Sequence, residues 1–265
     1  MSSWQTDLIQ ISGFFFKIWL ITKKRAYHLF EILFWPAIGL VSVGFLTRFL
    51  SLQPDMVAFI LVGVIALGVV QIGQLDISYV ILYSVWNKSL KQEMAAPINV
   101  FHLVAGTWVM GVVHSALVLG LLSLFSAYAF DFRFFQPGPA PLILFFFGLT
   151  LTAAVVGMLV CALAFKYGGR SHVAANSIVS VLILLSGIYY PIDVLPPSIK
   201  LCSYLIPITY FLEYFRSFYG FPMSCARPLL LGYALVIAYL ALASLALALA
   251  LQHAKKSGIM LKMSE

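Results

Sequence analysis

Charged residues are scarce in this sequence. Only 9% of its 265 residues are Asp, Glu, Lys or Arg, whereas 62% are hydrophobic, and the mean hydropathy is +1.01. Because soluble domains carry about 25% charged residues, this composition excludes a soluble globular protein. Apolar runs of about 20 residues, the length that crosses a bilayer, recur along the chain and exclude a peripheral protein with a single anchor. The sequence therefore predicts an integral membrane protein.

Cysteine is also scarce, with three residues in the chain. Cys161 falls inside an apolar run, while Cys202 and Cys225 fall in a later segment that is rich in proline. Their spacing matches neither a metal site nor a disulfide framework. Two free thiols and a Cys202–Cys225 disulfide in an oxidising compartment remain alternatives.

The apolar runs predict membrane-spanning helices. Six spans are expected, at residues 29–50, 56–82, 100–130, 141–165, 171–190 and 229–252. The sequence contains no internal repeat and no low-complexity linker, so residues 1–265 are expected to form a single transmembrane domain. The expected fold class is an all-α integral membrane protein.

Lysine and arginine residues predict the orientation of these spans, because cytoplasmic segments carry an excess of both. An even number of spans places both termini on one side. That side receives eleven basic residues: Lys17, Lys23, Lys24, Arg25, Lys88, Lys91, Lys166, Arg170, Lys255, Lys256 and Lys262. The other side receives five: Arg48, Arg133, Lys200, Arg216 and Arg227. Both termini are therefore predicted to be cytoplasmic, and the net charge of +7 calls for no nucleic-acid partner.

Residues 1–28 are predicted to form an amphipathic helix at the cytoplasmic membrane surface. Apolar residues recur there at helical spacing with polar residues between them. The basic cluster of Lys23, Lys24 and Arg25 follows, where it would meet anionic lipid. The alternative is that the basic cluster is only a simple stop of the chain at the membrane edge. The apolar positions are Trp4, Leu8, Ile11, Phe15 and Ile18.

Residues 191–228 form a long connection that is too apolar for a solvated loop. Pro191, Pro196, Pro197 and Pro207 exclude one continuous helix, because each internal proline removes a backbone donor and clashes with the preceding turn. Non-helical backbone at membrane depth must be buried in protein or line a wet cavity. The segment is therefore expected to form short re-entrant external helices between spans five and six, packed on the spans or on a second subunit.

Residues 86–99 form a polar loop between the second and third spans. Asn87 to Ala95 favour a helix, which Pro97 closes. A short helix would then lie across the membrane surface, where a cytoplasmic partner could rotate the two attached spans. The alternative is an ordinary polar loop.

Three segments, in this order, carry a family resemblance. They are LFEILFWPAIGLVSVGFL at 29–46, WNKSLKQEMAAPIN at 86–99, and SGIYYPIDVLP with LIPITYFLEYFR at 186–196 and 205–216. With the amphipathic start and the span order, they make the chain resemble the permease subunits of type 2 ATP-binding-cassette (ABC) transporters, a family of exporters. The resemblance covers nearly the whole chain.

The resemblance implies a division of roles. The loop would be the coupling helix that docks on the ATPase subunit, through Asn87, Lys88, Leu90, Lys91, Glu93, Met94 and Pro97. The broken segment would form an external gate, with Tyr189, Tyr190, Pro191, Pro207, Tyr210, Glu213 and Arg216. The implied partners are two cytoplasmic ABC ATPase subunits, a second permease copy in a homodimer, and membrane lipids. The implied location is the bacterial cytoplasmic (inner) membrane.

The sequence lacks the Gly-x-x-x-x-Gly-Lys-Ser/Thr loop that cradles nucleotide phosphates. Gly168 and Gly169 precede Arg170 but form only a short turn. We therefore expect no cofactor in this chain, and ATP and magnesium in the partner subunit.

Polar residues inside the spans are candidates for intramembrane contacts: Gln71, Gln74, Asp76, His114 and Asn176. A count from Met56 places Asp76 about 30 Å along its span, at the inner interface. His114 falls near mid-span and is expected to be a neutral imidazole bonded to a neighbouring helix. Asp76, His114, His102 and His172 are expected to lie at different depths, too scattered for a catalytic cluster.

The external segment also carries a charge pair and many tyrosines. Glu213 and Arg216 lie three residues apart and are expected to pair on one helix face. The aromatic residues fit an interfacial belt or, alternatively, a stacking surface for a sugar or lipid headgroup. They are Tyr189, Tyr190, Tyr204, Tyr210, Tyr214, Phe215, Phe218 and Tyr219.

These features predict a non-catalytic permease of an ATP-driven exporter. The scarcity of buried charge favours an amphiphilic substrate: a lipid, a lipid-linked glycan or polysaccharide, or a hydrophobic drug. The alternatives are a secondary transporter or a membrane-embedded transferase without an ATPase partner.

Overall fold

The computed structural model describes residues 3–24, 26–89, 92, 100–167 and 171–256. Over this part of the chain the regular structure is helical and contains no β-strand, as the sequence predicts. The elements are α1 (Ser3–Lys24), α2 (Ala26–Phe49), α3 (Pro54–Trp86), α5 (Val100–Phe130), α6 (Pro139–Tyr167), α7 (His172–Leu185), the 3-10 helix η2 (Ile192–Val194), α8 (Pro197–Ser203), α9 (Pro207–Ser217) and α10 (Pro228–Lys256).

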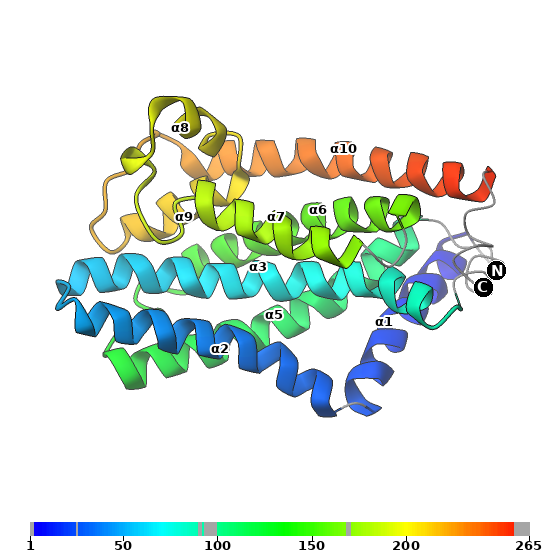
Figure 1. The fold of residues 1–265 in the computed structure, drawn as a ribbon, viewed down its shortest axis with the longest axis horizontal. Helices are drawn as coiled ribbons and strands as arrows, with labels where there is room; N and C mark the ends of the chain where they lie inside the picture. Colours follow the sequence, from blue (N-terminus) through cyan, green and yellow to red (C-terminus); the bar gives the residue numbers. More distant parts are fainter. Residues whose placement is uncertain (1–2, 25, 90–91, 93–99, 168–170, 257–265) are drawn as a thin grey trace.

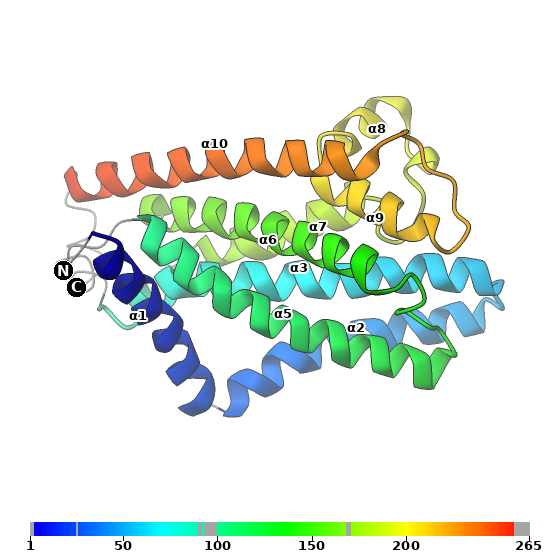
Figure 2. The same cartoon turned by 180° about the vertical axis from the view of Figure 1, so that it is seen from behind.

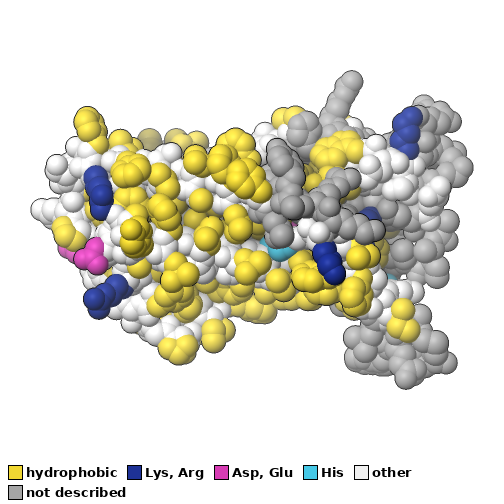
Figure 3. Space-filling view, turned by 90° about the horizontal axis from the view of Figure 1, so that it is seen from below, with side chains coloured by type: hydrophobic (Ala, Val, Ile, Leu, Met, Phe, Trp, Pro, Cys, Tyr) yellow, Lys and Arg dark blue, Asp and Glu magenta, His cyan; other side chains and the backbone are white. Residues whose placement is uncertain are grey.

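Five long helices form a bundle. Helices α2, α3, α5, α6 and α10 are each long and apolar enough to cross a membrane, as five of the six predicted spans require. Helix α1 and the end of α10 lie at one end of the bundle, and α8 and α9 lie at the other (Figures 1 and 2). Figure 3 shows hydrophobic side chains gathered along the middle of one face, with Lys and Arg toward its ends. This pattern suits contact with a hydrocarbon layer.

Helix α7 differs from the fifth span that the sequence predicts at 171–190. It has 14 residues, a length of about 21 Å against a hydrocarbon core of about 30 Å. The helix ends at Leu185 because Gly187 adopts a positive φ of 70°, which turns the chain away. Six full-length spans are therefore not confirmed, although α7 leads the chain from the end of α6 back toward α8 and α9 (Figure 1).

Helix α3 is the centre of the bundle. Leu61, Val62 and Ile65 are fully buried in it. Glycines bring its neighbours close: a Cβ on Gly73 would lie 3.0 Å from both Ala153 of α6 and Ser115 of α5. Close approach of this kind is how membrane helices pack without a hydrophobic driving force between them. Polar side chains on α3 are consequently placed against other helices rather than in lipid.

Helix α1 packs against α5. Phe14 and Ile18 are 6% and 5% exposed, and Asp7 Oδ1 lies 3.1 Å from His102 Nε2 on α5. Lys17 Nζ donates to Ser84 Oγ on α3 at 3.0 Å. The N-terminal helix is thus joined to the bundle by polar as well as apolar contacts, and its place in the headgroup layer stays a prediction.

The chain after α3 corrects the predicted start of the coupling helix at Asn87. The Ser89 amide donates to Ser84 O at 2.9 Å, and the Lys88 amide donates to Val85 O at 3.2 Å. With Lys88 at a φ of 56°, these bonds form a Schellman ending of α3. Asn87 to Ser89 are therefore a turn rather than helix. Of the other docking residues, Leu90, Lys91, Glu93, Met94 and Pro97 lie outside the described residues.

The segment 191–228 contains short helices, as its prolines predict. Pro191 and Pro196 precede η2 and α8, while Pro197 and Pro207 are the first residues of α8 and α9. Proline suits these positions because the first helical amide has no intrahelical acceptor. Phe215 anchors α9 by stacking on Phe145 of α6 with ring centroids 4.2 Å apart.

Candidate functional site

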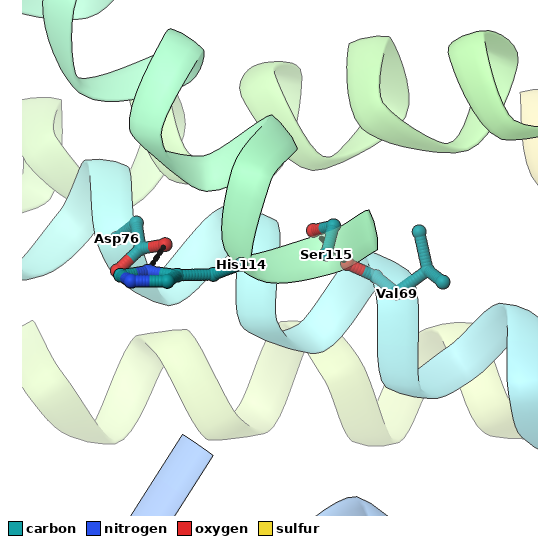
Figure 4. Close-up of polar contacts among 4 residues, drawn as sticks. All are labelled: Val69, Asp76, His114 and Ser115. Carbon is teal, nitrogen blue, oxygen red and sulfur yellow. Dashed lines mark hydrogen bonds and ion pairs between the residues drawn. The ribbon is translucent and has the colours of Figure 1, made fainter. Parts of the chain in front are cut away.

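Asp76 and His114 form a buried polar pair between α3 and α5. The Asp76 Oδ2 lies 2.8 Å from His114 Nδ1, and the two residues are 5% and 1% exposed (Figure 4). Nearby, Ser115 Oγ donates to the Val69 carbonyl oxygen at 3.0 Å across the same two helices (Figure 4). The prediction that His114 bonds to a neighbouring helix is confirmed.

The prediction that Asp76 and His114 lie at different depths is wrong, because the two side chains are in contact. The count along the span placed Asp76 at its inner end, whereas α3 continues to Trp86, about 15 Å beyond Asp76. A buried carboxylate with a histidine partner therefore lies inside the bundle. His102 lies elsewhere on α5, with its Nε2 3.1 Å from Asp7 Oδ1.

A cavity of about 230 Å³ adjoins Asp76 between α2, α3 and α7. It brings together three of the predicted intramembrane residues, Gln71, Asp76 and Asn176, which come from α3 and α7. The other residues that line the cavity were not predicted from the sequence. Those on α3 share one helix face with Gln71 and Asp76, because successive lining residues are one or three positions apart. The remaining lining residues are Ile32, Trp35, Ile72, Leu75 and Tyr79.

Gln74 lies elsewhere on α3 and does not line this cavity. It is fully buried, and its Oε1 lies 3.4 Å from Ser78 Oγ. Its Nε2 has no hydrogen-bond partner among the residues that the structure describes. Its backbone oxygen faces Gly157 of α6, where a Cβ would lie 3.2 Å away. Gln74 is therefore a packing contact between α3 and α6 rather than part of the cavity.

Arg216 holds the opposite end of the bundle together. Its Nε and Nη2 donate to Phe59 O at 3.1 and 2.9 Å. Its Nη1 donates to Gly187 O at 2.7 Å, and its Nη2 donates to Ile188 O at 2.8 Å. The guanidinium also lies 3.4 Å from the centroid of the Phe59 ring. One side chain on α9 thus fixes the start of α3 and the turn after α7.

Burial lowers the pKa of Arg216 to about 9, so the side chain stays protonated at neutral pH. The chain makes room for it at Gly63, where a Cβ would lie 2.0 Å from Ile188 O and 2.7 Å from Arg216 Nη2. Gly63, Phe59 and Gly187 were not singled out from the sequence. A glycine in an apolar run gives no signal of the distant group that it accommodates.

The expected Glu213–Arg216 pair is not formed. No salt bridge joins the two within the described part of the chain, because Arg216 turns inward to backbone oxygens. Glu213 instead lines a second cavity of about 210 Å³ beside Arg216 and Ser224. Burial raises the pKa of the Glu213 carboxyl, although Ser224 and the charge of Arg216 act in the opposite direction.

The gate tyrosines bond mainly to backbone. Tyr190 Oη donates to Leu184 O at 2.6 Å, and Tyr210 Oη donates to Tyr204 O at 2.9 Å. Tyr189 is half-buried. These bonds hold the turn and the short helices in place, and the choice between an aromatic belt and a stacking surface stays open. Cys202 and Cys225 are free thiols.

The comparisons with known proteins agree with this architecture. Residues 13–219, more than half of the chain, match the family model of the ABC-2 type transporter. The chain therefore belongs to the ABC-2 type transporter family, and it is a multi-pass membrane permease of that class. An uncharacterized protein of Archaeoglobus fulgidus is 43% identical to it over 58 residues, which are 22% of this chain and 91% of that protein.

Proposed function

We propose that this chain is the membrane-spanning permease subunit of an ATP-driven exporter in the bacterial cytoplasmic membrane. The observation that carries the proposal is the family match over residues 13–219. Placing both termini in the cytoplasm is supported by the excess of basic residues on that side and by α1 and the end of α10 lying at the same end. The segment with α8 and α9 is then the external cap.

The energy source in this proposal is a separate ATPase, bound as two copies to a dimer of permeases. The absence of a phosphate-binding loop from the sequence supports this arrangement, with ATP and magnesium held by the partner. The permease itself performs no covalent chemistry. It docks on the ATPase through the loop at 86–99.

Helix α3 supports a mechanical link from that loop to the cap. Its 33 residues extend about 50 Å and include Phe59, whose oxygen Arg216 binds, and Asp76, before the helix ends at the turn at Asn87. A force on the loop would reach the cavity and the cap along one helix. A change between two conformations of the transporter needs contacts whose energies differ between those conformations. In this proposal the ATPase supplies such contacts at the loop.

The substrate in this proposal is an amphiphile. The bundle buries few charges and exposes apolar side chains along its length, which suits a molecule that enters from the bilayer. A lipid, a lipid-linked glycan or a hydrophobic drug fits this description.

The proposal is tested by purifying the tagged chain in mild detergent and assaying ATPase activity with the co-purifying subunit. Reversing the charge of the loop with Lys88→Glu and Lys91→Glu should leave folding intact and lower ATPase activity about tenfold, because docking charges are lost. A matched control is Lys255→Glu with Lys256→Glu, on the last turn of α10. Equal activity of the two double variants, or no ATPase partner, would contradict the proposal.

One observation favours a second candidate, a proton-driven secondary transporter. The Asp76–His114 pair is a buried carboxylate and imidazole of the kind that carries protons across membranes. Reconstituted vesicles distinguish the two functions: transport that needs a pH gradient and no ATP supports the secondary transporter. Transport that needs ATP and the partner subunit supports the exporter.

A further inference from the structure

The cavity beside Asp76 has an unusual lining for a bundle this apolar. Asp76 supplies a carboxylate, Gln71 and Asn176 supply amides, and Trp35 and Tyr79 supply aromatic rings. Among the described residues that line it, none is Lys or Arg. The lining therefore offers negative charge and aromatic surface without a built-in cation.

The Asp76 carboxylate keeps an acceptor for a ligand. Its Oδ2 bonds to His114, while Oδ1 accepts no hydrogen bond from any described residue. A carboxylate at this depth is costly without partners, so an acceptor that faces a cavity calls for one. The aromatic rings complement the carboxylate, since cations are attracted to the faces of Trp and Tyr.

The cavity reaches the surface between α2 and α7. Trp35 is 62% exposed and Asn176 is exposed, whereas Asp76 is 5% exposed at the inner side. The outer faces of both helices carry exposed apolar side chains, such as Ile38 on α2 and Val181 on α7, so in a bilayer this mouth would open toward the hydrocarbon layer. A volume of about 230 Å³ is below the range of about 300–1,000 Å³ for sites that enclose a whole drug-sized molecule. The cavity therefore suits a headgroup whose tail remains outside.

We propose that this cavity binds the cationic headgroup of an amphiphile, a protonated amine or a quaternary ammonium, with its hydrocarbon tail in the bilayer. Asp76 pairs with the positive charge, Trp35 and Tyr79 contact the headgroup, and Gln71 and Asn176 accept hydrogen bonds from it where it carries N–H groups. As the substrate class of the transporter, this inference rests on the proposed function. As a binding site, it stands independently.

The test is equilibrium binding of radiolabelled dodecyltrimethylammonium to the purified permease in neutral maltoside micelles, with empty micelles subtracted. Asp76→Asn keeps the size of the side chain and should weaken binding about tenfold, the effect of losing one charge-assisted contact. Asp55→Asn is the matched control, because Asp55 is an exposed carboxylate at the start of the same helix. Trp35→Leu should weaken binding several-fold.

A gain of affinity keeps the test decisive if Asp76→Asn does not fold. Asn176→Asp adds a carboxylate at the exposed edge of the cavity and should tighten binding about threefold or more. Dodecyl sulfate, with the same tail and the opposite charge, should compete poorly. Equal binding by the Asp76 and Asp55 variants, or by wild type and Asn176→Asp, overturns the inference, as does equal competition by dodecyl sulfate.

Binding is measured without ATP, so its outcome is separate from the exporter assignment. If wild type binds the cation through Asp76 but has no ATPase partner, the site stands and the exporter proposal fails. If the ATPase partner is present but Asp76→Asn and Asn176→Asp leave binding unchanged, the exporter proposal stands and the cationic site fails.

Discussion

Arg216 and Asp76 are both buried charges on helices of the same bundle, yet their surroundings differ. Arg216 donates four hydrogen bonds to three backbone oxygens and covers the Phe59 ring. Among the residues that the structure describes, Asp76 has one side-chain partner, His114, and it borders a cavity. A charge with four hydrogen bonds to backbone oxygens fixes the fold. A charge with an unused acceptor beside an opening is suited to a ligand.

The comparison predicts the largest stability loss at Arg216. Arg216→Ala removes the guanidinium donors from the buried oxygens of Phe59, Gly187 and Ile188, which should cost about 3 kcal/mol or more. Thermal unfolding in detergent measures the loss. Arg216→Lys should recover only part of it, because an ammonium lacks the fork that reaches all three oxygens.

Arg227 supplies the control for this prediction. It is exposed at the start of α10, so Arg227→Ala should leave the melting temperature nearly unchanged. A small effect at Arg216, similar to that at Arg227, would contradict the role of Arg216 as the structural charge.

The next largest effect is expected at Gly63. In Gly63→Ala the new Cβ would approach Ile188 O, a backbone atom that Arg216 also binds, to 2.0 Å. Overpacking of this kind costs about 1–3 kcal/mol. Gly120→Ala on α5 is the control, because a Cβ there meets nothing within 4 Å. If both substitutions leave thermal unfolding unchanged, Gly63 does not accommodate Arg216 as described.

A smaller stability effect is expected at Asp76. Asp76→Asn keeps a hydrogen-bonding group for His114 and has the cavity on its other side, so the loss should be about 1 kcal/mol. The measurement is again thermal unfolding in detergent, without ligand. A loss as large as that of Arg216→Ala would show that Asp76 is a structural charge as well, and would remove the distinction between the two residues.

Features that depend on local composition could be predicted from the sequence, whereas features that depend on distant contacts could not. Hydropathy and proline positions predict the five long helices and the short helices after α7, because both depend on local composition. The length of α7 was overestimated, since Gly187 and Arg216 end it through a contact 29 residues apart. The contact between Asp76 and His114 was not predicted, because packing that joins residues 38 positions apart has no local signal.

The residues of the candidate site were likewise predictable only where the signal is local. Gln71, Asp76 and Asn176 were identified by their polarity, and the structure brings them together around one cavity. The contribution of Trp35 depends on the packing of α2 on α3, which a single sequence does not encode locally. The Glu213–Arg216 pair was expected from helical spacing, but a buried arginine gains more from several fixed carbonyls than from one partly exposed carboxylate.

The smallest expected effect is the pH dependence of stability that comes from Glu213, a partly buried carboxyl. Its pKa is raised by burial, so the folded state binds the proton more tightly than the unfolded chain. The stability that this carboxyl contributes is therefore fully present below the unfolded pKa of about 4.5 and is lost as the pH rises through the folded pKa. Glu213→Gln should remove this dependence and raise stability at pH 8 slightly, by less than about 1 kcal/mol after solvent screening. Thermal unfolding at pH 5 and pH 8 measures it, and a wild-type protein that is more stable at pH 8 by way of Glu213 would show that the charge of Arg216 outweighs burial there.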